Sequence, residues 1–163
     1  MFFVFVPFCC IAIYGLKWLL EIINKKIVYL IFALCLLVQV IWIVRNHPHQ
    51  FVYFNAVGKH FATSFDRDSW RLCNVEMLHW ILENDDDNQV TISMKPIYAN
   101  IAQSLFSEDE KNAMIITNEN PKYIIEDYKE IVGNNVEYDG YEEVYTIWVD
   151  GFKISSIFRC ENE

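Results

Sequence analysis

Residues 46–71 read NHPHQFVYFNAVGKHFATSFDRDSWR and separate two parts of the 163-residue chain that differ in composition. A long apolar segment precedes this stretch, and an amphipathic segment of mixed composition follows it. The stretch interleaves basic side chains with aromatic rings, namely Phe51, Tyr53, Phe54, Phe61, Phe65 and Trp70. This composition is favoured in the headgroup layer of a membrane. We interpret residues 46–70 as a collar at a bilayer surface, which either only anchors the chain or also shapes a site for a lipid-borne substrate.

Residues 1–45 predict two membrane-spanning helices. Residues 2–23 and 27–44 form two apolar runs, each close to the roughly 20 residues that cross a bilayer. Only residues 24–26 connect them, so we expect a tight antiparallel hairpin. Lys17, Lys25 and Lys26 cluster around the turn, and the positive-inside rule then places the turn in the cytoplasm. The sequence thus predicts an integral membrane protein whose C-terminal domain is extracytoplasmic.

This topology also places the N-terminus outside the cytoplasm. A cleaved signal peptide is not predicted, because no basic residue precedes the first apolar run and no small-residue cleavage site follows it. Another segment would then have to carry the N-terminus across the membrane. We therefore expect the chain to be the C-terminal part of a longer multi-span protein, or to begin at a misplaced start codon.

The charge of the chain is distributed unevenly. The formal net charge is −9, yet residues 1–45 carry four basic groups and one acidic group, which gives +3 and leaves −12 for residues 46–163. Nucleic acid is not an expected partner, because binding to phosphates needs a basic surface. An acidic exterior mainly favours solubility.

Residues 71–163 predict a small extracytoplasmic domain with a mixed sheet, of α/β or α+β class. We expect helices at residues 70–83 and 97–105, a charged loop at 107–112, and strands at 90–94, 113–117, 122–128, 143–149 and 152–159. Asp68 or Ser69 is the candidate N-cap of the first helix, and Pro96 opens the second. Asp150 and Gly151 predict a two-residue turn in a C-terminal β-hairpin.

Motifs that carry chemistry are few in this chain. It contains no glycine-rich phosphate loop, no nucleophile elbow and no HExxH sequence. His47 and His49 lack a third ligand at a recognisable spacing, so we predict no metal site and no cofactor. Cys73 and Cys160 either pair in an exported domain or remain two free thiols.

Three segments resemble bacterial glycosyltransferase family 39-like membrane proteins. The run from His47 to Asn55 reads HPHQFVYFN and is similar to a motif of that family, HPYxYxYFN, which follows the last membrane span. Asp68, Ser69 and Trp70 are similar to the start of its DYWG motif, whose glycine position is occupied by Arg71. The helix that ends LHWIL at residues 78–82 and the terminal hairpin from VYTIWVDG, residues 144–151, to Arg159 also look like that family.

The resemblance implies a relation to GT-C enzymes, which transfer sugar from a polyprenyl-phosphate carrier on the outer face of the membrane. The catalytic carboxylate of that family lies in the first outer loop of a multi-span region, which has no counterpart in these 163 residues. The implied assignment is a C-terminal fragment or split subunit of such a transferase, in a bacterial inner membrane, that is non-catalytic alone and acts with an upstream multi-span membrane subunit. The alternative is a stand-alone membrane-anchored binding or scaffold domain in cell-envelope glycan assembly.

Candidate site residues follow from the collar. Cationic and hydrogen-bonding groups at the headgroup depth could stabilise the phosphate of a lipid-linked sugar. The groups expected there are Arg45, His47, His49, Tyr53, Asn55 and Lys59. Asp68 and Trp70 are expected to be structural, because Asp68 as an N-cap would be occupied by backbone N–H groups. No catalytic residue is predicted.

Overall fold

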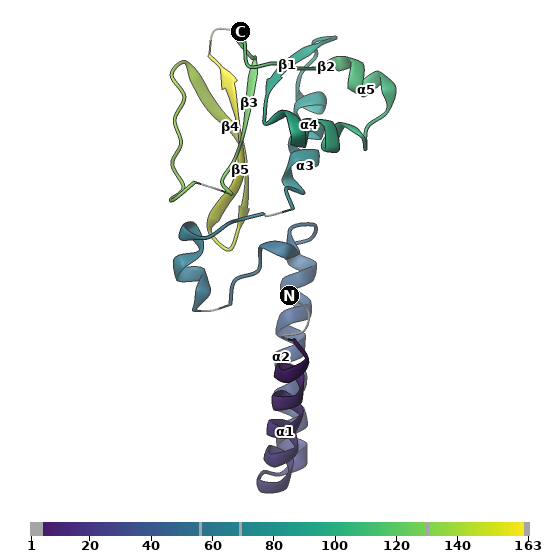
Figure 1. Ribbon diagram of the computed structural model, residues 1–163, viewed down its shortest axis with the longest axis vertical. Coiled ribbons are helices and arrows are strands. Elements are labelled where there is room, and N and C mark those ends of the chain that lie inside the picture. The colour runs from purple at the N-terminus through teal and green to yellow at the C-terminus, as the bar shows by residue number, and fades with distance from the viewer. Residues whose placement is uncertain (1–4, 56, 69, 130, 162–163) are drawn as a thin grey trace. The chain divides into compact units, whose positions relative to one another are not determined.

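The computed structural model describes residues 5–55, 57–68, 70–129 and 131–161. The chain forms two compact units, Met1–His47 and Pro48–Glu163. The first unit consists of helices, and the second contains a five-stranded sheet with helices packed on it (Figure 1). The predicted combination of two apolar helices and a small mixed-sheet domain is confirmed.

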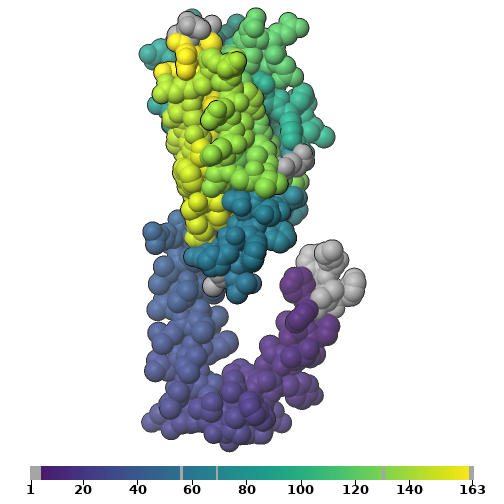
Figure 2. All heavy atoms as spheres, turned by 90° about the vertical axis from the view of Figure 1, so that its left-hand side faces the viewer, coloured from purple at the N-terminus to yellow at the C-terminus, as the bar shows by residue number. Residues whose placement is uncertain are grey.

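The first unit contains helices α1 (Phe5–Ile22) and α2 (Lys25–Arg45). Both are long and apolar enough to cross a bilayer, and almost all of their side chains are exposed. The side chain of Asn24 accepts a hydrogen bond from the backbone N–H of Lys26 and thereby caps α2. Residues near the turn, among them Leu19 and Val28, line a common apolar hollow, and the two helices diverge away from it (Figure 2). The two helices therefore contact each other mainly near the turn that connects them.

The sheet of the second unit has the order β2-β1-β3-β5-β4. Its strands are β1 (Val90–Ser93), β2 (Met114–Ile116), β3 (Tyr123–Asp127), β4 (Tyr141–Val149) and β5 (Phe152–Cys160). Strand β1 pairs in parallel with β2 and β3, whereas β5 pairs antiparallel with β3 and β4. The five predicted strands are thus all present. Their order could not be predicted from their spacing in the sequence, and the sheet contains both parallel and antiparallel pairs.

The C-terminal β-hairpin forms as predicted. Asp150 and Gly151 connect β4 to β5 with φ angles of 50° and 88°. Two successive positive φ values are typical of a type I′ turn, whose twist matches that of the flanking strands. Two register shifts interrupt the β4–β5 pairing, between Glu143 and Tyr145 and between Ile147 and Trp148. These bulges change which side chains face each side of the sheet.

Three helices accompany the sheet: α3 (Cys73–Asn84), α4 (Pro96–Gln103) and α5 (Glu108–Ala113). Helix α3 packs against β5 and α4, and its buried face contributes Met77, Leu78 and Ile81 to the core. Helix α5 corrects the prediction of a charged loop at residues 107–112. Ser107 and Glu110 form a capping box there, in which each side chain accepts a hydrogen bond from the other residue's backbone N–H.

Helix α3 begins later than residue 70, where it was predicted to start. Its N-cap is Leu72, so the prediction that Asp68 occupies the N-cap is wrong, while Ser69 lies outside the described residues. Asp68 and Arg71 have φ angles of 34° and 54°, which are incompatible with a right-handed helix. The carboxylate of Asp68 still accepts hydrogen bonds from the backbone N–H groups of Leu72 and Cys73, at 3.3 and 3.0 Å. Asp68 therefore caps the first turn from outside it.

Substitutions of Asp68 test this capping role. We expect Asp68→Asn to lower the free energy of unfolding by less than about 1 kcal/mol, because Asn accepts the same bonds and tolerates a positive φ. Asp68→Ala should cost about 2 kcal/mol, because it removes the acceptor and places a strained residue in the left-handed region. Urea denaturation of the full chain in nanodiscs measures both values. Equal losses in the two variants would contradict the capping role.

The collar packs on the sheet domain through two short 3-10 helices, η2 (Gln50–Val52) and η3 (Gly58–Ser64). Val52 and Ala62 are buried, and the ring of Phe54 meets that of Phe152 edge-on at 5.5 Å. Figure 2 shows the teal part of the chain, which includes η3, beside the lime-coloured part, where the backbone N–H of Gly133 donates to the carbonyl oxygen of Thr63 at 3.3 Å. The second unit therefore includes nearly all of the collar.

Candidate functional site

The predicted collar residues do not all lie in one environment. Arg45 and His47 belong to the first unit, where both side chains are exposed. Tyr53, Asn55 and Lys59 are exposed on the second unit. The side-chain oxygen of Asn55 accepts bonds from the N–H groups of residues 57 and 58, at 3.1 and 2.7 Å, and so closes a local turn before η3.

His49 lies inside the second unit, with 6% of its surface exposed. Its Nε2 atom lies 2.9 Å from Oε2 of Glu76 on α3. The hydroxyl of Tyr145 on β4 donates to the other oxygen of Glu76 at 2.8 Å. Glu76 therefore joins the collar, α3 and β4, three segments that are distant in the sequence.

This contact set perturbs two titratable groups. The hydrogen bond with His49 holds the pKa of Glu76 below its usual range, although burial acts in the opposite direction. Burial, followed by the bond to Glu76, raises the pKa of Tyr145 to about 12. Glu76 thus stays ionised and Tyr145 stays protonated at neutral pH. A carboxylate with both oxygens engaged and a depressed pKa is poorly suited to act as a general base.

A cavity of about 560 Å³ lies beside these residues, along the outer face of α3. Its walls include Val75, Glu76, His79, Trp80 and Glu83 from α3, together with Pro48 and Tyr145. The rings of Trp80 and Tyr145 stack with centroids 5.1 Å apart and planes 12° from parallel. The lining is mostly apolar, with carboxylates at the rim.

A second hollow of about 210 Å³ continues the first toward α4. The two share Leu72, Val75 and Leu105, so we treat them as one feature and call it the α3 groove. Trp70 and Leu105 border it and are each 72% exposed. Ile101 adds a further exposed aliphatic side chain. Large exposed side chains gathered around a hollow mark a surface for an apolar ligand or partner.

The pH dependence of stability tests the contacts of Glu76. Because its folded-state pKa is depressed, its stabilising contribution is present above the unfolded-state pKa and is lost as pH falls through the folded-state value. We expect Glu76→Gln to lower stability at pH 7 by about 1 kcal/mol, after allowance for solvent screening of a side chain that is 37% exposed. The loss should shrink toward pH 3.

Melting temperatures of the full chain between pH 3 and pH 7 measure this effect. Glu83→Gln on the same helix is the matched control, because Glu83 is exposed. A loss in Glu76→Gln that does not change with pH would contradict the ionic role.

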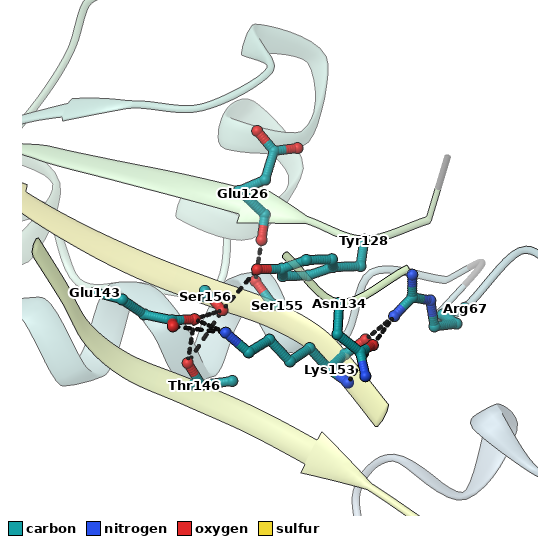
Figure 3. Close-up of polar contacts among 9 residues, drawn as sticks. All are labelled: Arg67, Glu126, Tyr128, Asn134, Glu143, Thr146, Lys153, Ser155 and Ser156. Carbon is teal, nitrogen blue, oxygen red and sulfur yellow. Dashed lines mark hydrogen bonds and ion pairs between the residues drawn. The ribbon is translucent and has the colours of Figure 1, made fainter. Parts of the chain in front are cut away.

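A separate polar cluster lies on β4 and β5 (Figure 3). Glu143 accepts hydrogen bonds from Lys153, Ser156 and Thr146 at 2.5, 2.6 and 2.8 Å. A serine, a lysine and a carboxylate could suggest nucleophilic catalysis. Ser156 is fully buried, however, and its hydroxyl donates to the carboxylate that also binds the lysine. No substrate can reach this hydroxyl, so the cluster holds the two strands together.

Sequence reasoning missed the central residues of the α3 groove. Trp80 was noted only within a helix motif, and nothing in the local pattern indicated that Glu76 or Tyr145 would meet His49. Among the described residues, no group of three or more His, Cys, Asp or Glu side chains could hold a metal ion. Cys73 and Cys160 are free thiols, which decides the alternative left open by the sequence. Burial raises the pKa of the Cys73 thiol, so it is unreactive.

The chain thus combines two long apolar helices with a mixed α/β domain that bears an apolar groove beside a collar rich in aromatic residues. Comparisons with protein-family models, with curated proteins and with solved structures found no match to this chain.

Proposed function

We propose that the protein is a membrane-anchored component of a system that transfers sugar from a polyprenyl-phosphate carrier, and that it acts with a multi-span membrane subunit. The sequence resemblance of the collar and the α3 segment supports the class of system. The exposed apolar surfaces of α1 and α2 support insertion in a bilayer, with the lysine-rich turn in the cytoplasm and the second unit outside.

The observation that carries the proposal is the apolar α3 groove, whose border includes collar residues Pro48 and Trp70. Only five residues separate Arg45, the last residue of α2, from Phe51, which is 65% exposed. Phe51 lies 6.3 Å from Trp70, centroid to centroid. Exposed rings of this kind favour the headgroup region. A groove bordered by such rings is suited to the apolar chain of a lipid.

In this proposal the groove binds the isoprenoid part of the carrier. Tyr53 and Lys59 of the second unit are candidates for contact with its phosphate, and Arg45 and His47 of the first unit are separate candidates for contact with a lipid phosphate. In this proposal the protein is non-catalytic alone. Glu76 is not assigned a catalytic role, because its carboxylate contacts His49 and Tyr145 and stays ionised. Its role is to bind and position the lipid-linked substrate for the partner.

Photocrosslinking tests the groove. The full chain in nanodiscs is mixed with a polyprenyl phosphate that carries a diazirine on its isoprenoid chain, and the labelled peptides are mapped. We expect labels on α3 and α4, and we expect Leu105→Asp to reduce them roughly tenfold, because a charge in an apolar groove is costly. Val132→Asp is the matched control, because Val132 is exposed and lies outside the groove. Labelling that Leu105→Asp leaves unchanged would overturn the assignment.

A second candidate function is a stand-alone anchored binding domain. It is favoured by the fact that the second unit alone forms the whole groove. The neighbouring reading frame separates the two candidates: a multi-span protein with an acidic first outer loop would favour the transferase subunit. Co-expression with that protein then allows a transfer assay, in which Arg45→Ala and His47→Ala should lower the rate without changing the melting temperature of the second unit.

A further inference from the structure

A small polar cavity lies on the sheet, and it shares no lining residue with the α3 groove. It has a volume of about 260 Å³ and forms where β3 extends beyond the end of β1. Strand β1 ends at Ser93, which is paired with Ile124, whereas β3 continues to Asp127. The last residues of β3 therefore have no β1 neighbour. We call this cavity the strand-end pocket.

Polar side chains from four segments line the strand-end pocket. They are Ser93 at the end of β1, Lys95 just after it, Asn118 after β2, Glu126 on β3 and Tyr138 in the segment before β4. The hydroxyl of Ser93 donates to Oδ1 of Asn118 at 2.9 Å, and the hydroxyl of Tyr138 donates to Glu126 in a short hydrogen bond. Cavities outside the carboxyl ends of strands in open α/β sheets are common ligand sites.

The charges around the pocket balance. Asp127 also lines it, but its carboxylate is paired with the guanidinium of Arg71. Lys95 and Glu126 contribute one further positive and one further negative group to the lining. Burial raises the pKa of Glu126, while Tyr138 and Lys95 act in the opposite direction, so the carboxyl group has a reduced preference for its ionised form. A bound anion would be repelled by Glu126, and a bound cation would be repelled by Lys95.

We propose that the strand-end pocket binds a small neutral ligand that carries several adjacent hydroxyl groups, such as a single sugar ring or a cyclic polyol. Carboxyl and amide oxygens accept hydrogen bonds from hydroxyl groups, and the lysine and the amide nitrogen donate to them. A lining that offers both donors and acceptors is complementary to hydroxyl groups, each of which donates and accepts. The volume lies just below the range for drug-sized ligands, which suits one ring.

Ligand titration tests this proposal on the full chain in nanodiscs, prepared without sugar-based detergents. The probes are myo-inositol, D-glucose and N-acetyl-D-glucosamine, with glucosamine as the cationic and glucuronate as the anionic comparator. Saturation-transfer NMR and calorimetry measure binding. We expect at least one neutral probe to bind at millimolar concentration or better, and to bind more tightly than both charged comparators.

Variants locate the site. Asn118→Ala should weaken binding roughly tenfold, because it removes a donor and an acceptor from an exposed loop position. Glu126→Gln should change affinity for a neutral ligand less than about threefold, since the amide keeps an oxygen acceptor, whereas a cationic ligand would lose most of its affinity. Asp139→Asn, an exposed carboxylate outside the pocket, is the control.

Three outcomes would overturn the proposal. The first is that no neutral probe binds. The second is that glucosamine or glucuronate binds more tightly than the neutral probes and that Glu126→Gln changes this preference. The third is that a neutral probe binds equally well to Asn118→Ala. Thermal unfolding of each variant verifies that it is folded. Because the pocket shares no lining residue with the α3 groove, the lipid crosslinking result and this result are independent.

Discussion

Arg67→Met is expected to lower the free energy of unfolding of the second unit by roughly 3–4 kcal/mol. Arg67 is fully buried, and its guanidinium donates to the side chain of Asn134 at 2.9 Å and to the carbonyl oxygen of Lys153 at 2.6 Å (Figure 3). It also donates to the carbonyl oxygens of Ile131 and Gly133 at 2.6 and 2.5 Å. It lies 5.2 Å from the centre of the Tyr128 ring. Methionine fills similar space but leaves these acceptors unpaired.

Burial lowers the pKa of Arg67 from its ordinary value, yet an arginine keeps its charge in a protein. The charge is compensated by carbonyl dipoles, and the bonds connect the collar to β5 and to residues 131–134. Urea denaturation of the full chain measures the loss, and hydrogen exchange at residues 131–134 should rise with it. Arg159→Met at an exposed position should cost less than about 1 kcal/mol. Similar losses of stability in both variants would show that the buried hydrogen bonds of Arg67 do not stabilise the fold.

Asp127→Asn is expected to be comparably destabilising, by roughly 3–5 kcal/mol. The carboxylate of Asp127 forms a buried ion pair with Arg71, whose guanidinium also lies 3.5 Å from the centre of the Tyr98 ring. Removal of one charge leaves the other buried without compensation. The pair connects the end of β3 to the turn before α3, so its loss should also affect the Trp70 side of the α3 groove.

A double-mutant cycle separates the pair from its surroundings. Arg71 has a φ of 54°, so glycine is the replacement that keeps the backbone conformation. Arg71→Gly combined with Asp127→Asn should cost about 2 kcal/mol less than the sum of the single losses, because residues in direct contact couple by that amount. Asp139→Asn serves as the exposed control. Additive losses would mean that the two side chains stabilise the fold independently.

Local patterns predicted the elements of this protein well. The two apolar runs predicted α1 and α2, and short segments of alternating, apolar or strand-forming composition predicted all five strands. Asp150 and Gly151 predicted the final hairpin, because only a few residue types adopt two successive positive φ angles readily. The error at residues 107–112 had a local cause: the charge of the segment favoured a loop, and the capping box of Ser107 and Glu110, which is readable in the sequence, was not considered.

Collar residues show where such reasoning ends. His49, Arg45 and Lys59 look alike in the sequence as polar groups near a membrane, yet His49 is buried against Glu76 and the other two are exposed. Arg67 is one of the basic residues of the collar and Arg71 occupies a glycine position of the resembled motif, and both are buried structural residues. Arg71 pairs with Asp127, which is 56 positions away in the sequence. Arg67 donates to Ile131 and Lys153, which are 64 and 86 positions away. No local pattern could reveal such distant partners.

The sequence by itself determined the division into an apolar helical part and an acidic mixed-sheet domain, because hydrophobic periodicity and turn residues act within a few positions of the chain. Only the tertiary structure decided which polar residues are buried, that Glu76 meets His49 and Tyr145, and where the α3 groove and the strand-end pocket open. These features depend on the strand order β2-β1-β3-β5-β4 and on the bulges of the last hairpin. Both arise from contacts between distant segments, whose closure is driven by the burial of a shared core.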